Sequence, residues 1–507
     1  MDQPRARSGR PAAIARIRGP AAVVAGLTLL AVLLRVAGLD TKGFWQDEAI
    51  TVYTIKRGFG GMLRTVVDHE TTPPLYYVVA WAWAKVFGYG EVGLRSLSTL
   101  AGVAAVPISY LAAKELVSRR AGLVTALLVA VNPLLVWYGQ EARSYALLVP
   151  LSALTLLLFA RALHAPAGRL GRETTWWALA SAATIATHHF ALFLVLPELL
   201  WLLRARGRAR PLTVAAAVLL AVSAADLVLA AAQRSTAGVD WIAETPLPNR
   251  IVAIPGSFLI GFESPSPLLV AAVAAACAAV ALWLAAARTR PAERQGAALA
   301  FALAVAVVAI PLVLALGGSD YVFYRNVLPA LIPALVAFGA GFGAARAGML
   351  GAAALGVLCV VSLGVVAVTR NLPKYRKEVW REVAAEIGPA RGPRAIVITP
   401  RGPATVGLTL VYLPGTGSLA PQGAAVREIV IVAAPRRAPG ASARPHIPRP
   451  ASAPSSPVPG FHLTQRVEND KFTLLRYRSA RPVVVVPPQL QPARIDTVEA
   501  AVLLQPR

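Results

Sequence analysis

The chain has 507 residues, of which 56% are hydrophobic and 15% charged, and its formal net charge is +25. This composition is too apolar for a soluble protein, and the apolar residues are spread too evenly for a single membrane anchor. It therefore predicts a polytopic helical membrane protein. The basic residues cluster in short loops between apolar runs, so the positive-inside rule explains the charge and we predict no nucleic-acid partner.

Residues 1–19 form the first predicted segment, a cytoplasmic basic tail that carries five arginines. The apolar run at 20–39 has no obvious small-residue cleavage site, so we expect it to remain in the membrane as a signal anchor. The chain then leaves the bilayer on the outside. The first residues there read Phe-Trp-Gln-Asp-Glu-Ala and contain two adjacent carboxylates, Asp47 and Glu48.

Residues 40–91 are predicted to form the first extracytoplasmic loop. Within it, the segment 74–88 is apolar and aromatic, but its length falls short of the roughly 20 residues that a spanning helix needs. We expect a helix that lies along the outer membrane surface. The alternative, a short true span, would invert the topology of everything that follows. The basic pair at 119–120, which belongs in the cytoplasm, favours the surface helix.

The rest of the membrane domain, which we place at 20–371, is predicted from further apolar runs separated by short basic or polar loops. Together with the first span they give about eleven transmembrane helices, with the N-terminus inside and the C-terminus outside. The later spans are expected at 92–117, 121–138, 144–163, 175–187, 190–203, 211–231, 267–287, 297–316, 325–343 and 349–369.

From 372 the composition changes, and we predict a small extracytoplasmic α/β domain over 372–480. An amphipathic helix at 375–387 has apolar residues four apart. The expected strands are 394–399, 428–433, 461–465 and 471–477, with a helix at 404–413. The Pro-rich stretch 434–460 is predicted to be a disordered insert. The tail at 481–507 is left without an assignment.

The polar residues expected on the outer side of the membrane form the candidate site. Three of them, Arg95, Arg143 and Arg325, stand on the side that the positive-inside rule leaves poor in basic residues. Arginine is suited to bidentate recognition of phosphate, so outward carboxylates with outward arginines suggest a general base and a phosphate clamp. A solvated loop and interfacial anchors are the alternative. The other members are Asp47, Glu48, His69, Glu70, Glu141, Tyr145 and His189.

The order of these motifs resembles the family 39 glycosyltransferases of the GT-C superfamily, which include protein O-mannosyltransferases and lipid A aminoarabinose transferases. The motifs are W-x-D-E-A, H-x-x-x-P-P-L-Y-Y, F-G-x-x-E-x-x-x-R-x-x-S, Q-E-A-R-S-Y and Y-R-N-V-L-P-A-L-I-P. The resemblance covers 40–380 and is strongest over 44–160. It implies a GT-C fold, a polyprenyl-phosphate-linked sugar donor, an extracytoplasmic active site and inversion at the anomeric carbon.

The resemblance also implies roles for individual residues. Asp47 would deprotonate the acceptor hydroxyl, and Glu48 would help to orient Asp47 or the acceptor. The three arginines would neutralise the leaving polyprenyl phosphate. Glu70, His69, Glu141, Tyr145 and His189 are assigned to the acceptor or the cleft.

Two parts of this assignment stay open. The sequence Gln-Glu-Ala-Arg at 140–143 departs from the acidic pattern of the aminoarabinose transferases, so the acceptor is a glycan, a lipid or a protein. No cofactor is implied with certainty, although paired carboxylates leave a divalent cation open. For the two adjacent histidines a structural role is favoured over metal ligation, because neighbouring residues on a helix do not share a face.

The predicted function is therefore a plasma-membrane glycosyltransferase that moves a mannose-like hexose or a pentose from a polyprenyl-phosphate donor to an extracytoplasmic acceptor. The alternative is a non-enzymatic transporter or flippase of lipid-linked glycans. That class would place polar residues in the middle of spans, where this chain has few, with Glu198 and Asp226 as the exceptions. A glycan polymerase or ligase of another fold is a third reading, and it would not need the acidic pair.

Overall fold

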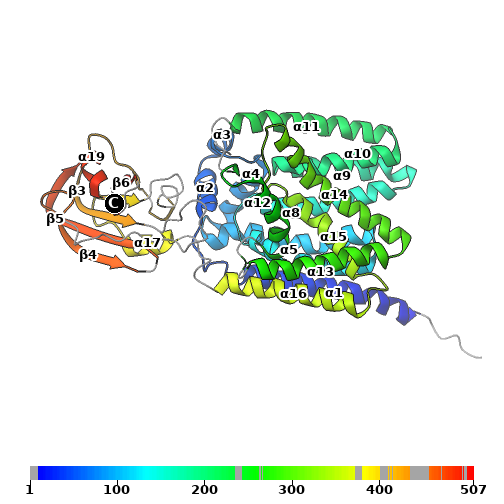
Figure 1. Ribbon diagram of the computed structural model, residues 1–507. Helices are drawn as coiled ribbons and strands as arrows, with labels where there is room; N and C mark the ends of the chain where they lie inside the picture. The colour runs from blue at the N-terminus through cyan, green and yellow to red at the C-terminus, as the bar shows by residue number, and fades with distance from the viewer. Residues whose placement is uncertain are drawn as a thin grey trace, which may run out of the picture. The chain divides into compact units, whose positions relative to one another are not determined.

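The computed structural model of the chain describes residues 10–234, 242–261, 264, 267–371, 379–399, 409, 411–413, 415–433, 456–469, 471–493, 495 and 499–506. The chain divides into two compact units. We call them the helical unit, Met1–Leu39 with Gly58–Tyr375, and the C-terminal unit, Asp40–Arg57 with Arg376–Arg507. Both are drawn in Figure 1.

The helical unit consists of long apolar helices, many of which run side by side in Figure 1. Among the described residues, seven helices are long and apolar enough to cross a membrane, which confirms the predicted polytopic helical class. The total of about eleven spans stays a prediction. Those seven lie within α1 (Arg10–Val36), α5 (Glu91–Leu116), α8 (Tyr145–His164), α11 (Arg210–Arg234), α13 (Pro267–Ala287), α14 (Pro291–Leu316) and α16 (Gly348–Asn371).

The helical unit also contains shorter helices. A helix, α4 (Leu75–Phe87), occupies the segment 74–88, and its place along the membrane surface stays a prediction. The remaining members are α3 (Phe59–His69), α6 (Arg119–Val131), α7 (Pro133–Tyr138), α9 (Leu170–Ile185), α10 (Leu192–Arg206), α12 (Leu247–Ile260) and α15 (Leu331–Phe342).

Small residues allow the helices to approach closely, as is common in membrane bundles. Helix α15 packs against α6, α13 and α14. A Cβ atom built on Gly341 would lie 1.8 Å from the carbonyl oxygen of Ala281 on α13. One built on Gly339 would lie 2.1 Å from the Thr125 hydroxyl on α6. Both contacts require glycine, so α15 is held at the centre of this group by backbone-to-backbone packing.

Two segments of the helical unit differ from the sequence prediction. The span predicted at 121–138 is two helices, because Asn132 ends α6 and its side-chain oxygen then caps α7 by accepting from the N–H of Leu135, 3.0 Å away. Pro133 follows at the first position of α7, where its missing N–H is tolerated. The segment between the spans predicted at 211–231 and 267–287 contains the helix α12, whose internal Pro255 obscured the helical pattern.

The C-terminal unit is built on a six-stranded sheet with the order β2-β6-β1-β3-β5-β4. Strands β1 and β3 are parallel, and the other neighbours are antiparallel. The central β1 is buried along its whole length, as its uninterrupted apolar sequence predicts. The bounds are β1 Arg394–Thr399, β2 Gly417–Ser418, β3 Ala424–Ala433, β4 His462–Glu468, β5 Thr473–Val485 and β6 Ala501–Gln505.

The sheet extends past the predicted domain boundary at 480. Strand β5 continues to Val485, and β6, from the unassigned tail, pairs along one side of β1. A short helix, α19 (Pro487–Leu490), lies between them. The predicted insert lies outside the described residues over 434–455, and most of the predicted helix at 404–413 does so as well.

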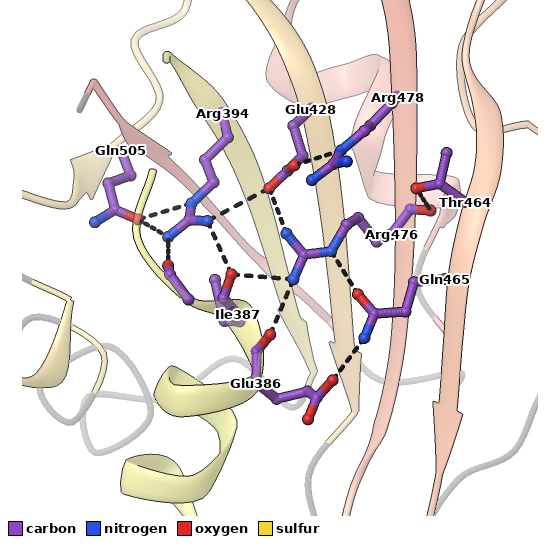
Figure 2. A network of polar contacts seen from close by, with 10 residues as sticks. Glu386, Ile387, Arg394, Glu428, Thr464, Gln465, Arg476, Arg478 and Gln505 are labelled. Carbon is purple, nitrogen blue, oxygen red and sulfur yellow. Dashed lines mark hydrogen bonds and ion pairs between the residues drawn. The ribbon is translucent and has the colours of Figure 1, made fainter. Parts of the chain in front are cut away.

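One helix, α17 (Trp380–Ile387), is fixed to the sheet by two buried arginines. The Arg394 guanidinium on β1 donates to the carbonyl oxygens of Ile387 (3.1 Å) and Gly388 (2.6 Å). Arg476 on β5 donates to the carbonyl of Ile387 (3.0 Å) and to the Glu428 carboxylate (2.8 Å). Figure 2 shows both side chains converging on the end of the helix. Cations at a helix C-terminus complement its dipole and satisfy its last carbonyls, so α17 and the sheet form one rigid body.

Candidate functional site

The acidic pair lies in the first turn of α2 (Gln46–Ile55), in the C-terminal unit. Trp45 is the N-cap in an extended conformation, and the Glu48 carboxylate accepts a hydrogen bond from its backbone N–H at 3.2 Å. Glu48 is 1% exposed, whereas Asp47 is half-buried. Negative side chains at a helix N-terminus are favoured by the dipole. The two adjacent carboxylates therefore differ, since Glu48 caps the helix and Asp47 stands beside it at the surface.

A second group of candidate residues lies in the helical unit, around Arg143. This side chain comes from the turn between α7 and α8, and one of its nitrogens, Nη1, is 3.4 Å from the Glu70 carboxylate and 3.0 Å from the Tyr77 hydroxyl. All three residues are buried. Burial raises the pKa of the Tyr77 phenol well above its usual value, so the hydroxyl keeps its proton. The structure thus brings together Glu70 and Arg143, which are 73 positions apart in the sequence.

A stack of rings borders this arginine. The Tyr145 ring is 4.8 Å from that of Tyr138 and 5.4 Å from the His188 imidazole. Burial lowers the pKa of His188 to about 3, and the neighbouring His189, Arg143 and Arg325 act in the same direction. His188 is therefore neutral at ordinary pH. Both arginines therefore lie close enough to this imidazole to act on its charge.

His189, assigned to the cleft from the sequence, is a structural bridge. Its Nδ1 is 2.9 Å from a carboxylate oxygen of Asp226, and its Nε2 is 2.9 Å from the side-chain oxygen of Gln233, both on α11. The Gln233 amide nitrogen in turn donates to the carbonyls of Val66 and Thr72, on either side of Glu70. The bridge therefore fixes the turn that carries Glu70.

The remaining predicted residues occupy separate positions. Arg95 in the first turn of α5 is buried and donates to the carbonyl of Leu39 at 2.9 Å. Glu141 accepts a hydrogen bond from the Trp137 indole at 2.8 Å. The Arg325 guanidinium lies 5.2 Å from the centre of the Phe323 ring. His69, at the end of α3, is exposed.

Three residues that contribute to this region were not singled out in the sequence. Tyr77 belongs to the quoted P-P-L-Y-Y motif, and its place one turn into α4 was the available signal. Arg250 on α12 and Asp320 form a bidentate ion pair, with distances of 2.8 and 2.5 Å, that holds the loop before Arg325. The sequence offered no spacing that could pair them, because they are 70 positions apart.

The divalent cation left open by the paired carboxylates finds no ready-made site in the described part of the chain. No group of three or more His, Cys, Asp or Glu side chains that could hold a metal ion occurs there. Of the adjacent acids, Glu48 is engaged with the backbone of its own helix.

Comparison with known proteins gives one family match and several matches of fold. Residues 71–232 match the family described as dolichyl-phosphate-mannose-protein mannosyltransferase. No curated protein sequence matches the chain. ArnT from Cupriavidus metallidurans, solved with undecaprenyl phosphate, has a TM-score of 0.51 at 13% identity, covering 89% of this chain and 97% of that one.

Two further structures are longer than this chain. The arabinofuranosyltransferase AftD from Mycobacteria has a TM-score of 0.51 at 16% identity, covering 92% of this chain and 40% of that one. An oligosaccharyltransferase from Archaeoglobus fulgidus has a TM-score of 0.47 at 15% identity, covering 73% of this chain. The chain spans only 56% of that protein's length. The family match and the shared fold confirm the resemblance to GT-C membrane glycosyltransferases that the sequence motifs predict.

Proposed function

We propose that this chain is a multi-pass membrane glycosyltransferase that moves a sugar from a polyprenyl-phosphate donor to a hydroxyl acceptor on the outer face of the plasma membrane. The observation that carries the proposal is the buried Arg143, which lies just before the start of α8 and contacts Glu70 and Tyr77. A buried arginine is suited to an anionic ligand because its guanidinium can make bidentate contacts, and a lipid phosphate is such a ligand.

The proposed reaction is a single displacement. The Asp47 carboxylate takes the proton from the acceptor hydroxyl while the acceptor oxygen forms a bond to the anomeric carbon. The bond between that carbon and the phosphate oxygen breaks, and the electron pair leaves with the polyprenyl phosphate. One displacement inverts the anomeric configuration. Arg143, with Arg95 and Arg325, stabilises the negative charge that develops on the leaving phosphate.

The comparisons support the donor class. The family matched by residues 71–232 is named for dolichyl-phosphate-mannose, and ArnT was solved with undecaprenyl phosphate. Mannose, which the family name gives, and arabinose, the sugar named for the arabinofuranosyltransferase AftD, are therefore the first sugars to test, in keeping with the predicted hexose or pentose. The acceptor class, whether glycan, lipid or protein, is part of what the test must determine.

The transporter alternative receives less support from the described residues. Its best candidates were the polar groups within the spans, Glu198 and Asp226. Glu198 accepts a hydrogen bond from the Trp177 indole at 2.9 Å, and Asp226 is engaged with His189. Both therefore have partners that account for their presence in apolar surroundings.

The experiment that tests the proposal measures sugar transfer in membranes that contain the full chain. Polyprenyl-phosphate donors carrying radiolabelled mannose or arabinose are supplied, and the label that appears in acceptors is counted. Transfer that depends on Arg143 supports the proposal, with Arg143→Gln as the test variant and Arg172→Gln, on the exposed start of α9, as the matched control. Transport of the lipid-linked sugar without transfer would overturn it.

A further inference from the structure

We propose that residues 376–507 of the C-terminal unit position the acidic pair, Asp47 and Glu48, and that they act through two positioning residues, Arg381 and Tyr412. The inference rests on the proposed function for its catalytic consequence. Its structural part stands on contacts within the C-terminal unit, where residues 40–57 cluster with residues 376–507 although the sequence separates them by more than three hundred positions.

The first contact is made by Arg381, in the first turn of α17. Its two terminal nitrogens donate to the backbone carbonyls of Asp40 (2.8 Å) and Thr41 (3.3 Å). A positive side chain at a helix N-terminus opposes the helix dipole, so this position does not favour α17 itself. Its partners are instead the carbonyl groups of the segment that leads into the acidic helix.

The second contact is made by Tyr412. Its hydroxyl accepts a hydrogen bond from the backbone N–H of Phe44 at 2.5 Å, and the two rings are 6.3 Å apart. Phe44 is 1% exposed and immediately precedes Trp45, the N-cap of α2. Described residues 40–45 form neither helix nor strand, so their positions depend on such contacts.

Close packing at Gly43 completes the arrangement. A Cβ atom built on this residue would lie 3.2 Å from the Tyr412 hydroxyl and 3.3 Å from the Arg381 Cβ. The backbone at Gly43 thus packs closely against both positioning residues, and a larger side chain at this position would push them apart.

These contacts link the sheet to Asp47 through rigid parts. Arg394 and Arg476 hold the C-terminal end of α17 on the sheet, and Arg381 at its other end holds the carbonyls of Asp40 and Thr41. Glu48 ties the N-cap to its own helix, so a shift of Phe44 and Trp45 moves the start of α2. A general base must be placed accurately, because a displacement of about 1 Å can lower a rate by roughly 100-fold.

The first test removes each contact with the least change of shape. Tyr412→Phe keeps the ring and removes the acceptor hydroxyl, and Arg381→Met keeps the aliphatic stem. Each should lower kcat by roughly 10- to 100-fold and leave the KM for the lipid donor unchanged, because the donor contacts lie elsewhere in the proposal. The matched control is Tyr53→Phe, which removes a hydroxyl paired with Arg57 on the exposed side of α2.

The decisive test replaces the contact by a covalent bond in the full chain. Gly43→Cys with Arg381→Cys brings two Cβ atoms within a few tenths of an ångström of the separation found in disulfides. Cys277 and Cys359, both in the helical unit, are replaced by alanine in all variants. We expect a disulfide to form, kcat to fall when it is reduced and to recover when it is reoxidised, and neither single-cysteine variant to respond to redox state.

The outcomes separate this inference from the proposed function. A folded double variant that forms no disulfide, or one whose kcat is the same oxidised and reduced, would overturn the positioning role. If the native chain transfers no sugar from any donor, the proposed function fails. The disulfide yield and the hydrogen exchange of residues 40–57 still decide whether Arg381 and Tyr412 hold this segment in place. Faster hydrogen exchange of residues 40–57 in Tyr412→Phe, but not in Tyr53→Phe, supports the positioning role of Tyr412. Equal exchange in the two variants contradicts it.

Discussion

Arg143 and Glu70 form an ion pair 3.4 Å long in which both side chains are almost completely buried. The pair joins the turn before α8 to the end of α3, and the Tyr77 hydroxyl completes it. In the proposed reaction the lipid phosphate competes with Glu70 for the same guanidinium. The balance between these two anions should therefore set both the stability of the free protein and its affinity for the donor.

Glu70→Gln tests this balance. The substitution keeps the shape but removes the charge of a carboxylate that is paired with a buried cation, so we expect the free energy of unfolding to fall by about 3 kcal/mol. Binding of undecaprenyl phosphate should tighten by about tenfold, which corresponds to about 1.4 kcal/mol. Thermal unfolding in detergent and a lipid-binding titration measure the two effects.

The matched control for this prediction is Glu173→Gln, which removes the acid of a pair whose Arg172 partner is 63% exposed, and which should change both quantities much less. In the double variant Glu70→Gln/Arg143→Gln, stability should largely return while lipid binding is lost. If Glu70→Gln were as stable as the native chain and bound the lipid equally well, the assigned competition would be wrong.

The two adjacent acids should respond differently to substitution. Glu48→Gln keeps an oxygen that can accept from the Trp45 N–H, so we expect stability and most of the transfer activity to be retained. Glu48→Ala loses the cap and should cost about 1 kcal/mol, with a lower kcat because α2 is less well held. Kinetic assays of both variants test this difference. An equal loss of kcat in Glu48→Gln and Glu48→Ala would instead show that the negative charge of Glu48 takes part in the reaction.

The pH dependence of stability should report the Arg250–Asp320 pair. The Arg250 hydrogen bonds hold the pKa of Asp320 below its usual value of about 3.9. The stabilisation is therefore complete above pH ~4 and is lost as the pH falls through the lowered pKa of the folded state. Asp320→Asn should cost roughly 2 kcal/mol near neutral pH. The difference in thermal midpoint between native chain and variant should shrink as the pH falls below about 4, and a constant difference there would refute this prediction.

The contacts of His189 with Asp226 and Gln233 predict that a substitution at Asp226 is tolerated and one at Gln233 is not. Gln233 donates to two carbonyls, so its side-chain oxygen faces His189 and requires an N–H at Nε2. Asp226→Asn can donate to the remaining lone pair at Nδ1, and we expect it to fold with nearly native stability. Gln233→Leu leaves buried polar groups unpaired and should cost about 2 kcal/mol. Thermal unfolding separates the two variants, and similar losses would show that the charge of Asp226 is needed.

The sequence predicted those features that depend on local pattern. Strand β1 has the predicted bounds, because a short run of β-branched and apolar residues between polar ends is typical of a buried strand. Val379 at the N-cap of α17, and Val383 and Ile387 within the helix, are all buried, as a helical period requires. Arg143 and Glu70 were both assigned to the outer site from their positions at the ends of apolar runs.

Features that depend on partners distant in the sequence were not predicted. Strand β6 lies in a Pro/Val-rich tail and is defined by its pairing with β1 rather than by its own pattern. The same holds for Tyr412, whose hydroxyl meets the amide of Phe44 across 368 positions. The sequence allowed either a cleft role or a structural role for His189. Only the positions of Asp226 and Gln233, which are distant in the sequence, assign it a structural role.

The measurement that tests the central claim most directly is transfer of radiolabelled mannose or arabinose from polyprenyl-phosphate donors, comparing native membranes with those that contain Asp47→Asn. The substitution keeps the size of the side chain and removes the base, so folding should be unchanged while transfer falls by roughly 100-fold or more. A fully active Asp47→Asn protein would remove Asp47 as the base. A well-folded native chain that transfers neither sugar would contradict the assignment as a glycosyltransferase.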